Sequence, residues 1–184
     1  MAINKKPTQD LSIEHGGIML MLKVMEKVAE KLQNGETVQK EHLEKMVEFI
    51  KNFADKCHHG KEEDILFPEL IKKSSNVKLV NELLAEHKTG RDLIGGIEKS
   101  LNTYQPGNPE AIHIAINMAG YIQLLIEHIK KENIILFPLA DKELSKELQE
   151  TIEKKFEKLE SKVIGVGKHE EYYGWLTELK QIYI

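Results

Sequence analysis

The sequence predicts an all-α protein, an up-down-up-down four-helix bundle with additional C-terminal helices. Three observations support this fold class. Apolar residues recur at helical spacing, no stretch shows the two-residue alternation of a strand, and turn signals interrupt the pattern at regular intervals. The expected breaks are Asn34-Gly35, Ser74-Ser75-Asn76, Pro106-Gly107-Asn108-Pro109 and Ile164-Gly165-Val166-Gly167.

These breaks set the expected elements in order. The first helix begins near Ser12, and Thr37 caps the second helix. The third and fourth helices lie on either side of the proline-rich break, and two further helices span about 141–163 and 168–181. The predicted organisation is therefore a four-helix bundle over residues 1–140 and a helical extension packed on the bundle over residues 141–184.

Composition limits the classes of function. The chain has 184 residues, a net charge of −4, and lysines interleaved with glutamates, so it lacks the concentrated basic face that nucleic acids require. No apolar run approaches the roughly 20 residues of a membrane helix, and no apolar stretch follows the first ten residues as in a secretory signal. The expectation is a cytoplasmic protein. The single cysteine, Cys57, is expected to be a buried, inert thiol.

One internal repeat stands out. HHGKEEDILFPEL begins at His58, and HIKKENIILFPLA begins at His128. Alignment on Leu-Phe-Pro matches His58 with His128 and Glu62 with Glu132. Residues four apart share one helix face, so each His-x-x-x-Glu pair can reach one site. The proline six residues after each glutamate is predicted to kink or end its helix.

The histidines are predicted to meet at one level. Roughly 18–20 residues separate each of His15, His58, His87 and His128 from the turn at the far end of its helix, a rise of about 27–30 Å. In an antiparallel bundle, all four helices then contribute a histidine to the same end of the core.

The residue types indicate a metal. Imidazoles with two carboxylates suit iron, and also zinc or manganese. A structural zinc site needs only four ligands, whereas at least six converge here, so the pattern favours two ions bridged by Glu62 and Glu132. His59 and Glu63 form an alternative register with the same spacing, but only His58 and Glu62 match the second copy of the repeat.

This set of residues resembles the hemerythrin family, in its HHE cation-binding branch, over about residues 10–140. The resemblance implies two iron ions with an oxo or hydroxo bridge. His15 and His58 would hold the first ion and His87 and His128 the second. Oxygen carriers have a second histidine on the third helix, which this chain lacks, so His59 is predicted as the fifth histidine.

The resemblance also implies a small ligand, such as oxygen, peroxide or nitric oxide, at an open position of the first ion. Apolar residues are expected to surround it: Ile18, Met19, Leu22 and Leu125. A binding protein or sensor is the favoured class. An enzyme that decomposes peroxide or reduces a diatomic, and an iron-holding module, are the alternatives. The sequence does not indicate the redox partner.

The remaining candidates have more than one interpretation. His42 and His113 lie about 15 residues before the metal histidine of their helix, so both are predicted at the surface. His169 is either an exposed residue or a lid over the site. Tyr121 lies on the face of His128 and lines either the site or the core, and Arg91 pairs with a carboxylate of the site or of the surface.

Overall fold

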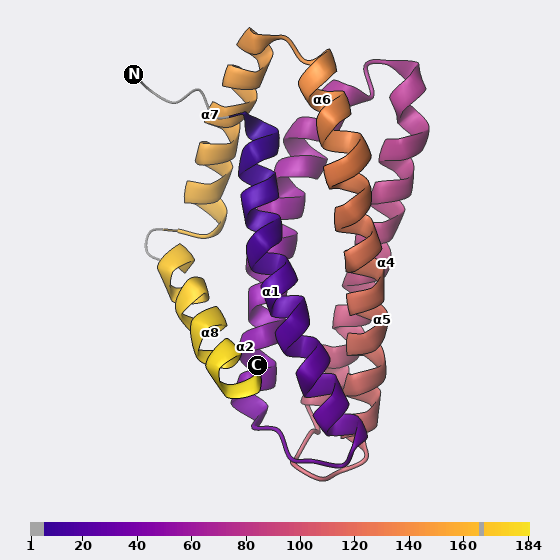
Figure 1. Cartoon of the computed structure of the whole chain (residues 1–184), viewed down its shortest axis with the longest axis vertical. Coiled ribbons are helices and arrows are strands. Elements are labelled where there is room, and N and C mark those ends of the chain that lie inside the picture. Colours follow the sequence, from indigo (N-terminus) through magenta and orange to yellow (C-terminus); the bar gives the residue numbers. More distant parts are fainter. Residues whose placement is uncertain (1–5, 166–167) are drawn as a thin grey trace.

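The structure, a computed structural model, describes residues 6–165 and 168–184. Its long axis is formed by four antiparallel rods (Figure 1). The rods are α1 (Pro7–Gln33); α2 (Lys40–Phe49) with η1 (Ile50–His59), η2 (Glu62–Leu66) and α3 (Phe67–Leu70); η3 (Ser74–Asn76) with α4 (Val77–Leu101); and α5 (Glu110–Lys131) with η4 (Glu132–Leu136) and α6 (Phe137–Glu143). Two C-terminal helices follow, α7 (Lys146–Val163) and α8 (Lys168–Tyr183). The described residues contain no strand, which confirms the all-α prediction.

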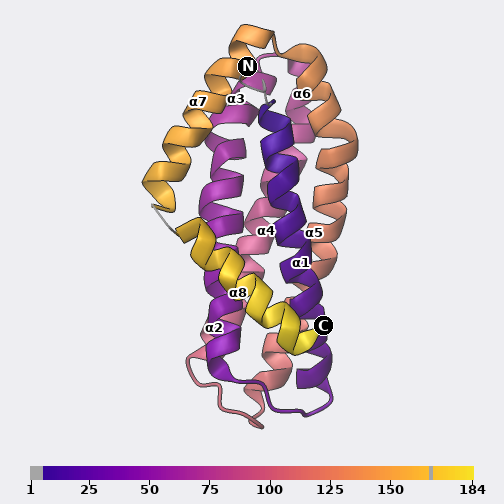
Figure 2. The same cartoon turned by 60° about the vertical axis from the view of Figure 1, so that its left-hand side comes forward.

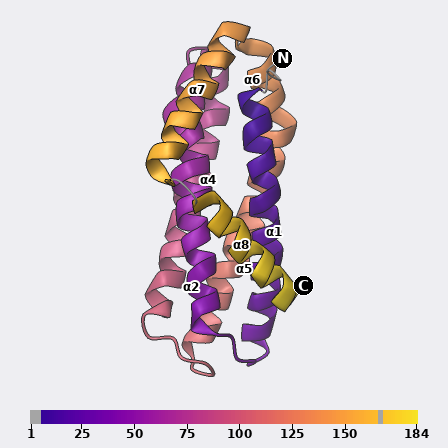
Figure 3. The same ribbon diagram turned by 90° about the vertical axis from the view of Figure 1, so that its left-hand side faces the viewer.

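Each rod contacts two others around the bundle axis. Helix α1 packs against α5 and η1, and α4 packs against α5 and against α2 and η1. The C-terminal helices lie outside this square. Helix α7 contacts α1, η1 and η2, and α8 crosses α1 and α2 obliquely (Figures 2 and 3). No helix among the described residues is both long and apolar enough to cross a membrane.

The first helix begins earlier than the predicted start near Ser12. Pro7 occupies its first turn, where the missing N–H costs nothing and the fixed φ suits the helix. The side chain of Gln9 accepts the backbone N–H of Lys6 at 3.0 Å, which satisfies another donor of this end. At the other end, Gly35 has a φ of 76°, a left-handed conformation that favours glycine after a helix.

The prolines of the repeat do not end their rods, so of the two predicted outcomes, a kink or an end, the second was wrong. Residues Glu62–Leu66 and Glu132–Leu136 are π-helical, and the rods continue to Leu70 and Glu143. The Phe67 N–H donates to the carbonyl of Glu62, five residues back. This wider turn changes the hydrogen-bond partners just before the proline, whose missing N–H would otherwise interrupt the ladder.

The apolar core is divided in two. The larger cluster fills the half of the bundle that includes Met25, Met46 and Met118, and the smaller cluster includes Leu11, Leu83 and residues of the two Leu-Phe-Pro segments. Between the clusters lies a buried polar layer: Glu14, His15, His58, His59, Lys61, Glu62, His87, His128 and Glu132. Buried polar groups are costly unless they are paired, so this layer requires a specific explanation.

Helix α8 covers a histidine that was predicted at the surface. His42 is buried, and its Nδ1 lies 2.7 Å from the hydroxyl of Tyr183 in α8. The prediction was wrong because it placed His42 by its distance from the metal histidines and did not consider the C-terminal helices. His113 is exposed, as predicted.

The His169–Glu160 pair at the α7–α8 junction should make stability depend on pH. The hydrogen bond to Glu160 raises the pKa of His169 above its ordinary value of 6.5. A raised histidine pKa gives stability that is complete below pH 6.5 and is lost as pH rises through the folded-state pKa. In urea unfolding, His169→Gln should therefore cost more at pH 5.5 than at pH 9. The cost should stay below about 1 kcal/mol because the pair is partly exposed.

The control for this experiment is the exposed-site variant His113→Gln. An equal cost of His169→Gln at both pH values would contradict the expectation.

Candidate metal centre

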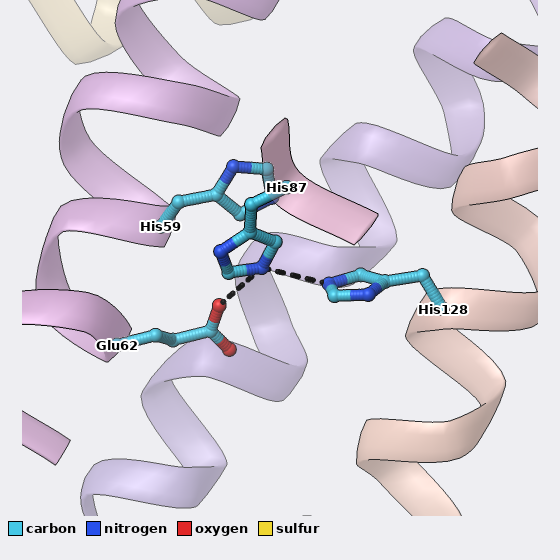
Figure 4. A group of neighbouring side chains, drawn as sticks. All are labelled: His59, Glu62, His87 and His128. Atoms are coloured by element: carbon cyan, nitrogen blue, oxygen red, sulfur yellow. Dashed lines mark hydrogen bonds and ion pairs between the residues drawn. The ribbon is translucent and has the colours of Figure 1, made fainter. Parts of the chain in front are cut away.

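The seven predicted residues lie together in the polar layer. One group of potential ligand atoms comes from His15, His58, Glu62 and Glu132, and a second comes from His59, Glu62, His87 and His128 (Figure 4). Within each group these atoms lie within 4.8 Å of one another, and all seven residues are buried. Glu62 belongs to both groups.

Each glutamate points one oxygen at each group. Glu62 Oε1 lies 3.6 Å from His58 Nε2, and its Oε2 lies 3.5 Å from His87 Nε2. Glu132 Oε2 lies 3.2 Å from His15 Nε2, and its Oε1 lies 3.2 Å from His128 Nε2. Two ligand atoms that bind one ion at right angles, each at about 2.1 Å, lie about 3 Å from each other. The distances between the glutamate oxygens and the imidazole nitrogens are close to this spacing. Each carboxylate therefore has the position and span to bridge two ions.

All five imidazoles are oriented alike. Each Nδ1 faces a carboxylate or amide oxygen at 2.7–3.2 Å. These oxygens only accept, so each Nδ1 carries the proton and each Nε2 keeps a free lone pair. Such partners fix the ring and increase the basicity of the ligating nitrogen. The pairs are His15 with Asn133, His58 with Glu14, His59 with Asp55, His87 with Glu63, and His128 with Glu86.

The supporting contacts repeat between the two halves of the bundle. Glu14 and Glu86, each just before a histidine of the site, accept from the repeated histidines His58 and His128. Both glutamates also accept from a lysine three residues after that histidine, Lys61 and Lys131. The first helical hairpin is thus matched in these contacts by the second, a relation we call the pseudo-twofold.

The two phenylalanines of the repeat follow the same relation. Phe137 stacks on His15 with ring centroids 5.3 Å apart, and Phe67 stacks on His87 at 5.9 Å. Each ring covers the site on the side of the smaller apolar cluster, so both Leu-Phe-Pro segments close the polar layer against water.

The polar atoms of the layer are better satisfied by a bound cation than by contacts with one another. Nε2 of His15 and all four oxygens of Glu62 and Glu132 are buried and make no hydrogen bond within the described part of the chain. The Nε2 atoms of His87 and His128, which both keep lone pairs, lie only 2.9 Å apart. Converging lone pairs and carboxylates repel each other unless positive charge lies among them.

Burial tunes the protonation of these groups. Burial, with the nearby Glu132 carboxylate, raises the pKa of Glu62 well above its usual value. Burial also lowers the pKa values of His58 and His59 well below 6.5. These histidines are therefore neutral at physiological pH, the state in which they can bind a metal.

One flank of the site holds a fully buried lysine. Lys61 is 0% exposed, and its Nζ lies 2.6 Å from Glu14, 2.9 Å from Asp10 and 2.9 Å from Glu160. Glu160 belongs to α7, so a chain of charged contacts leads from the C-terminal extension through Lys61 and Glu14 to His58. Burial raises the pKa of Glu14 to about 7, against the lowering effect of Lys61.

The other candidates have defined places. Arg91 donates to Asp55 and Glu63, the carboxylates that orient His59 and His87. Cys57 is buried, as predicted, and burial raises the pKa of its thiol to about 12. His169 pairs with Glu160 and lies outside the two groups described above; with Glu14, Cys57 and Glu160 it forms a third, less buried cluster of potential ligand atoms.

The sequence interpretation did not identify the residues that orient the imidazoles. Glu14, Asp55, Glu63 and Glu86 resemble the solvated acids of any surface helix. A signal was nevertheless present, because Glu-His occurs at 14–15 and again at 86–87, before each copy of the His-x-x-Lys-Glu pattern.

Fold and site together define a four-helix bundle with a buried cation-binding layer of histidines and glutamates. The hemerythrin HHE cation-binding domain matches residues 6–140, and the chain belongs to this family.

Curated relatives add no activity. Uncharacterised proteins of Mycobacterium bovis and Mycobacterium tuberculosis are 24% identical over 131 residues. The match covers 71% of this chain and 51% of each relative, so the chain spans about half the length of the curated relatives it matches. No solved structure is significantly similar.

Proposed function

We propose that the protein holds two non-haem iron ions and binds, or reacts with, oxygen or a related small ligand such as peroxide or nitric oxide. One observation carries the proposal: Glu62 and Glu132 each direct one oxygen to the first group of histidines and one to the second. The family supplies the expectation of a bound cation.

The proposed ligand sets are unequal in histidines. The first ion would take His15 and His58, and the second would take His59, His87 and His128. Glu62 belongs to both groups, and Glu132 would be shared because its two oxygens face His15 and His128. When bound, the iron pair supplies the electrons for reversible ligand binding or ligand reduction. The carboxylates, and for His15 the Asn133 amide, that fix each Nδ1 keep the Nε2 atoms aimed at the ions.

The chain also shields the site. Phe67 and Phe137 cover it on one side, and the buried residues Ile18, Leu22 and Leu125 of the larger cluster are expected to cover it on the other. Exclusion of water strengthens every electrostatic contact in the layer and protects a bound ligand from proton transfer.

The first test is metal analysis of protein purified without added metal, with an ultraviolet-visible spectrum. We expect two iron ions per chain. Zinc or manganese in place of iron, or fewer than one ion per chain, would refute the proposal.

A second test separates the favoured binding function from its alternatives. The reduced protein is mixed with oxygen or peroxide in a stopped-flow instrument. A stable spectrum of the ligand complex supports binding, repeated turnover of peroxide supports an enzyme, and no change supports iron holding.

A further inference from the structure

A cavity of about 130 Å³ lies between the second rod and α4, beside the second group of histidines. Its inner wall includes Ile50, Ile94, Gly90 and Tyr121, and the rings of His59 and His87 separate it from the glutamates. A water molecule occupies about 30 Å³ in the liquid, so the cavity accepts a molecule of two to four heavy atoms.

Gly90 lines the cavity and lets the Tyr121 ring lie close to α4. It follows His87 by three residues, just under one helical turn. A Cβ at Gly90 would lie 3.3 Å from Cε2 of Tyr121, a tight contact that would require the ring to shift. A small residue beside a ligand histidine therefore allows the tyrosine ring its place at the cavity.

Tyr121 brings a phenol to the wall of the cavity. The residue is 2% exposed. Burial raises the pKa of this phenol, so it remains protonated. A protonated hydroxyl at a cavity wall can donate a hydrogen bond to an acceptor that enters.

The charges at the rim are compensated. Arg91 Nη2 lies 2.8 Å from Asp55 and 2.6 Å from Glu63, and Lys51 pairs with Glu98 at 2.6 Å. Since both cations among the described residues that line the cavity are paired, the cavity does not concentrate anions, and its apolar wall favours an uncharged guest.

When the two halves are compared through the pseudo-twofold, the residues around the cavity differ from their counterparts around the first group of histidines. Three polar or small residues around the cavity have bulky apolar counterparts at the same offsets from the first group of histidines. The counterparts are Ile18 for Gly90, Met19 for Arg91, and Leu125 for Asp55. The two halves thus match in their supporting contacts and diverge where the cavity lies.

We propose that this cavity is the entry chamber for an uncharged oxygen ligand of two heavy atoms, dioxygen or hydrogen peroxide, and that the Tyr121 hydroxyl donates a hydrogen bond to the ligand there. The proposal rests on the proposed iron pair for the onward reaction. It assigns entry to the His59 and His87 side of the layer, from which the ligand reaches the open position expected at the first ion.

The first experiment tests the cavity without metal. Crystals of chelator-treated protein are pressurised with xenon, which occupies small, largely apolar cavities. We expect xenon density beside Ile94 in the unmodified protein and none in Ile94→Phe, whose larger ring fills the space. Absence of density in the unmodified protein overturns the proposal.

The second experiment uses the iron-loaded protein and hydrogen peroxide in stopped flow. Ile94→Phe should slow the reaction at least tenfold, whereas Ile116→Phe, at an exposed position of α5, should leave the rate within twofold. An unchanged rate in Ile94→Phe, or a larger effect of Ile116→Phe, overturns the proposal.

The conservative variant Tyr121→Phe covers the case in which Ile94→Phe does not fold. It should keep the xenon density and lower the apparent affinity for peroxide about fivefold to tenfold, the loss expected for one hydrogen bond. An unchanged affinity would remove the role of the hydroxyl. A chain without iron would refute the proposed function alone, because the xenon result stands independently of metal.

Discussion

Replacing Glu62 by glutamine is expected to reduce the metal content from two ions per chain to below one. Glu62 is the residue shared by both ligand groups, and a neutral amide cannot supply the charge or the two equivalent oxygens of a bridge. Elemental analysis of purified protein measures the result. Glu127→Gln, an exposed position one residue before His128, is the matched control and should keep both ions. Two ions retained in Glu62→Gln would contradict the assignment.

The same variant should be more stable than the unmodified chain once metal is removed. A raised carboxyl pKa costs folding stability that grows as pH rises from about 4.5 toward the folded-state value. Urea unfolding in chelator should therefore show Glu62→Gln gaining stability at pH 7 and almost none at pH 4.5. A loss of stability at pH 7 would show that Glu62 is satisfied without a cation.

Replacing Lys61 by methionine should have the largest effect on stability. Lys61 is fully buried, and its removal leaves the buried Glu14 and two further carboxylates without their shared cation. Loss of one partner from a buried charge network costs about 3–5 kcal/mol. Lys51→Met, which breaks an exposed ion pair, should cost less than about 1 kcal/mol in the same urea titrations.

A double variant separates charge from packing in the Lys61 result. Glu14→Gln removes the carboxylate that Lys61 Nζ approaches most closely. If uncompensated charge is the cause, adding Glu14→Gln to Lys61→Met should restore at least about 1 kcal/mol. Strictly additive losses, or equal costs for Lys61→Met and Lys51→Met, would contradict the electrostatic explanation.

The sequence could predict the fold and the convergence of the histidines because both follow from helical geometry. The apolar spacing and the turns define four rods, and a constant rise per residue brings His15, His58, His87 and His128 to one level. His59 was predicted to face the second ion because it follows His58 in the helix, and the structure places it in the second group. That these residues bind iron remains a prediction.

Other features depend on contacts that spacing does not encode. The π turns before Pro68 and Pro138 arise where a missing N–H meets a requirement for packing, and single-sequence periodicity assumes regular helices. In the sequence, Lys61 precedes charged residues, a pattern typical of a surface position. In the structure, however, α7 covers it. His42 is buried for the same kind of reason, by α8.

The pseudo-twofold has a consequence for the electronic character of the site. The position that matches His59 in the second hairpin is Ile129, so the two halves supply unequal numbers of nitrogen donors. Two ions bound there would occupy chemically inequivalent environments. The oxidation states of a mixed-valence pair would then be localised, with the more electron-rich donor set stabilising the higher oxidation state.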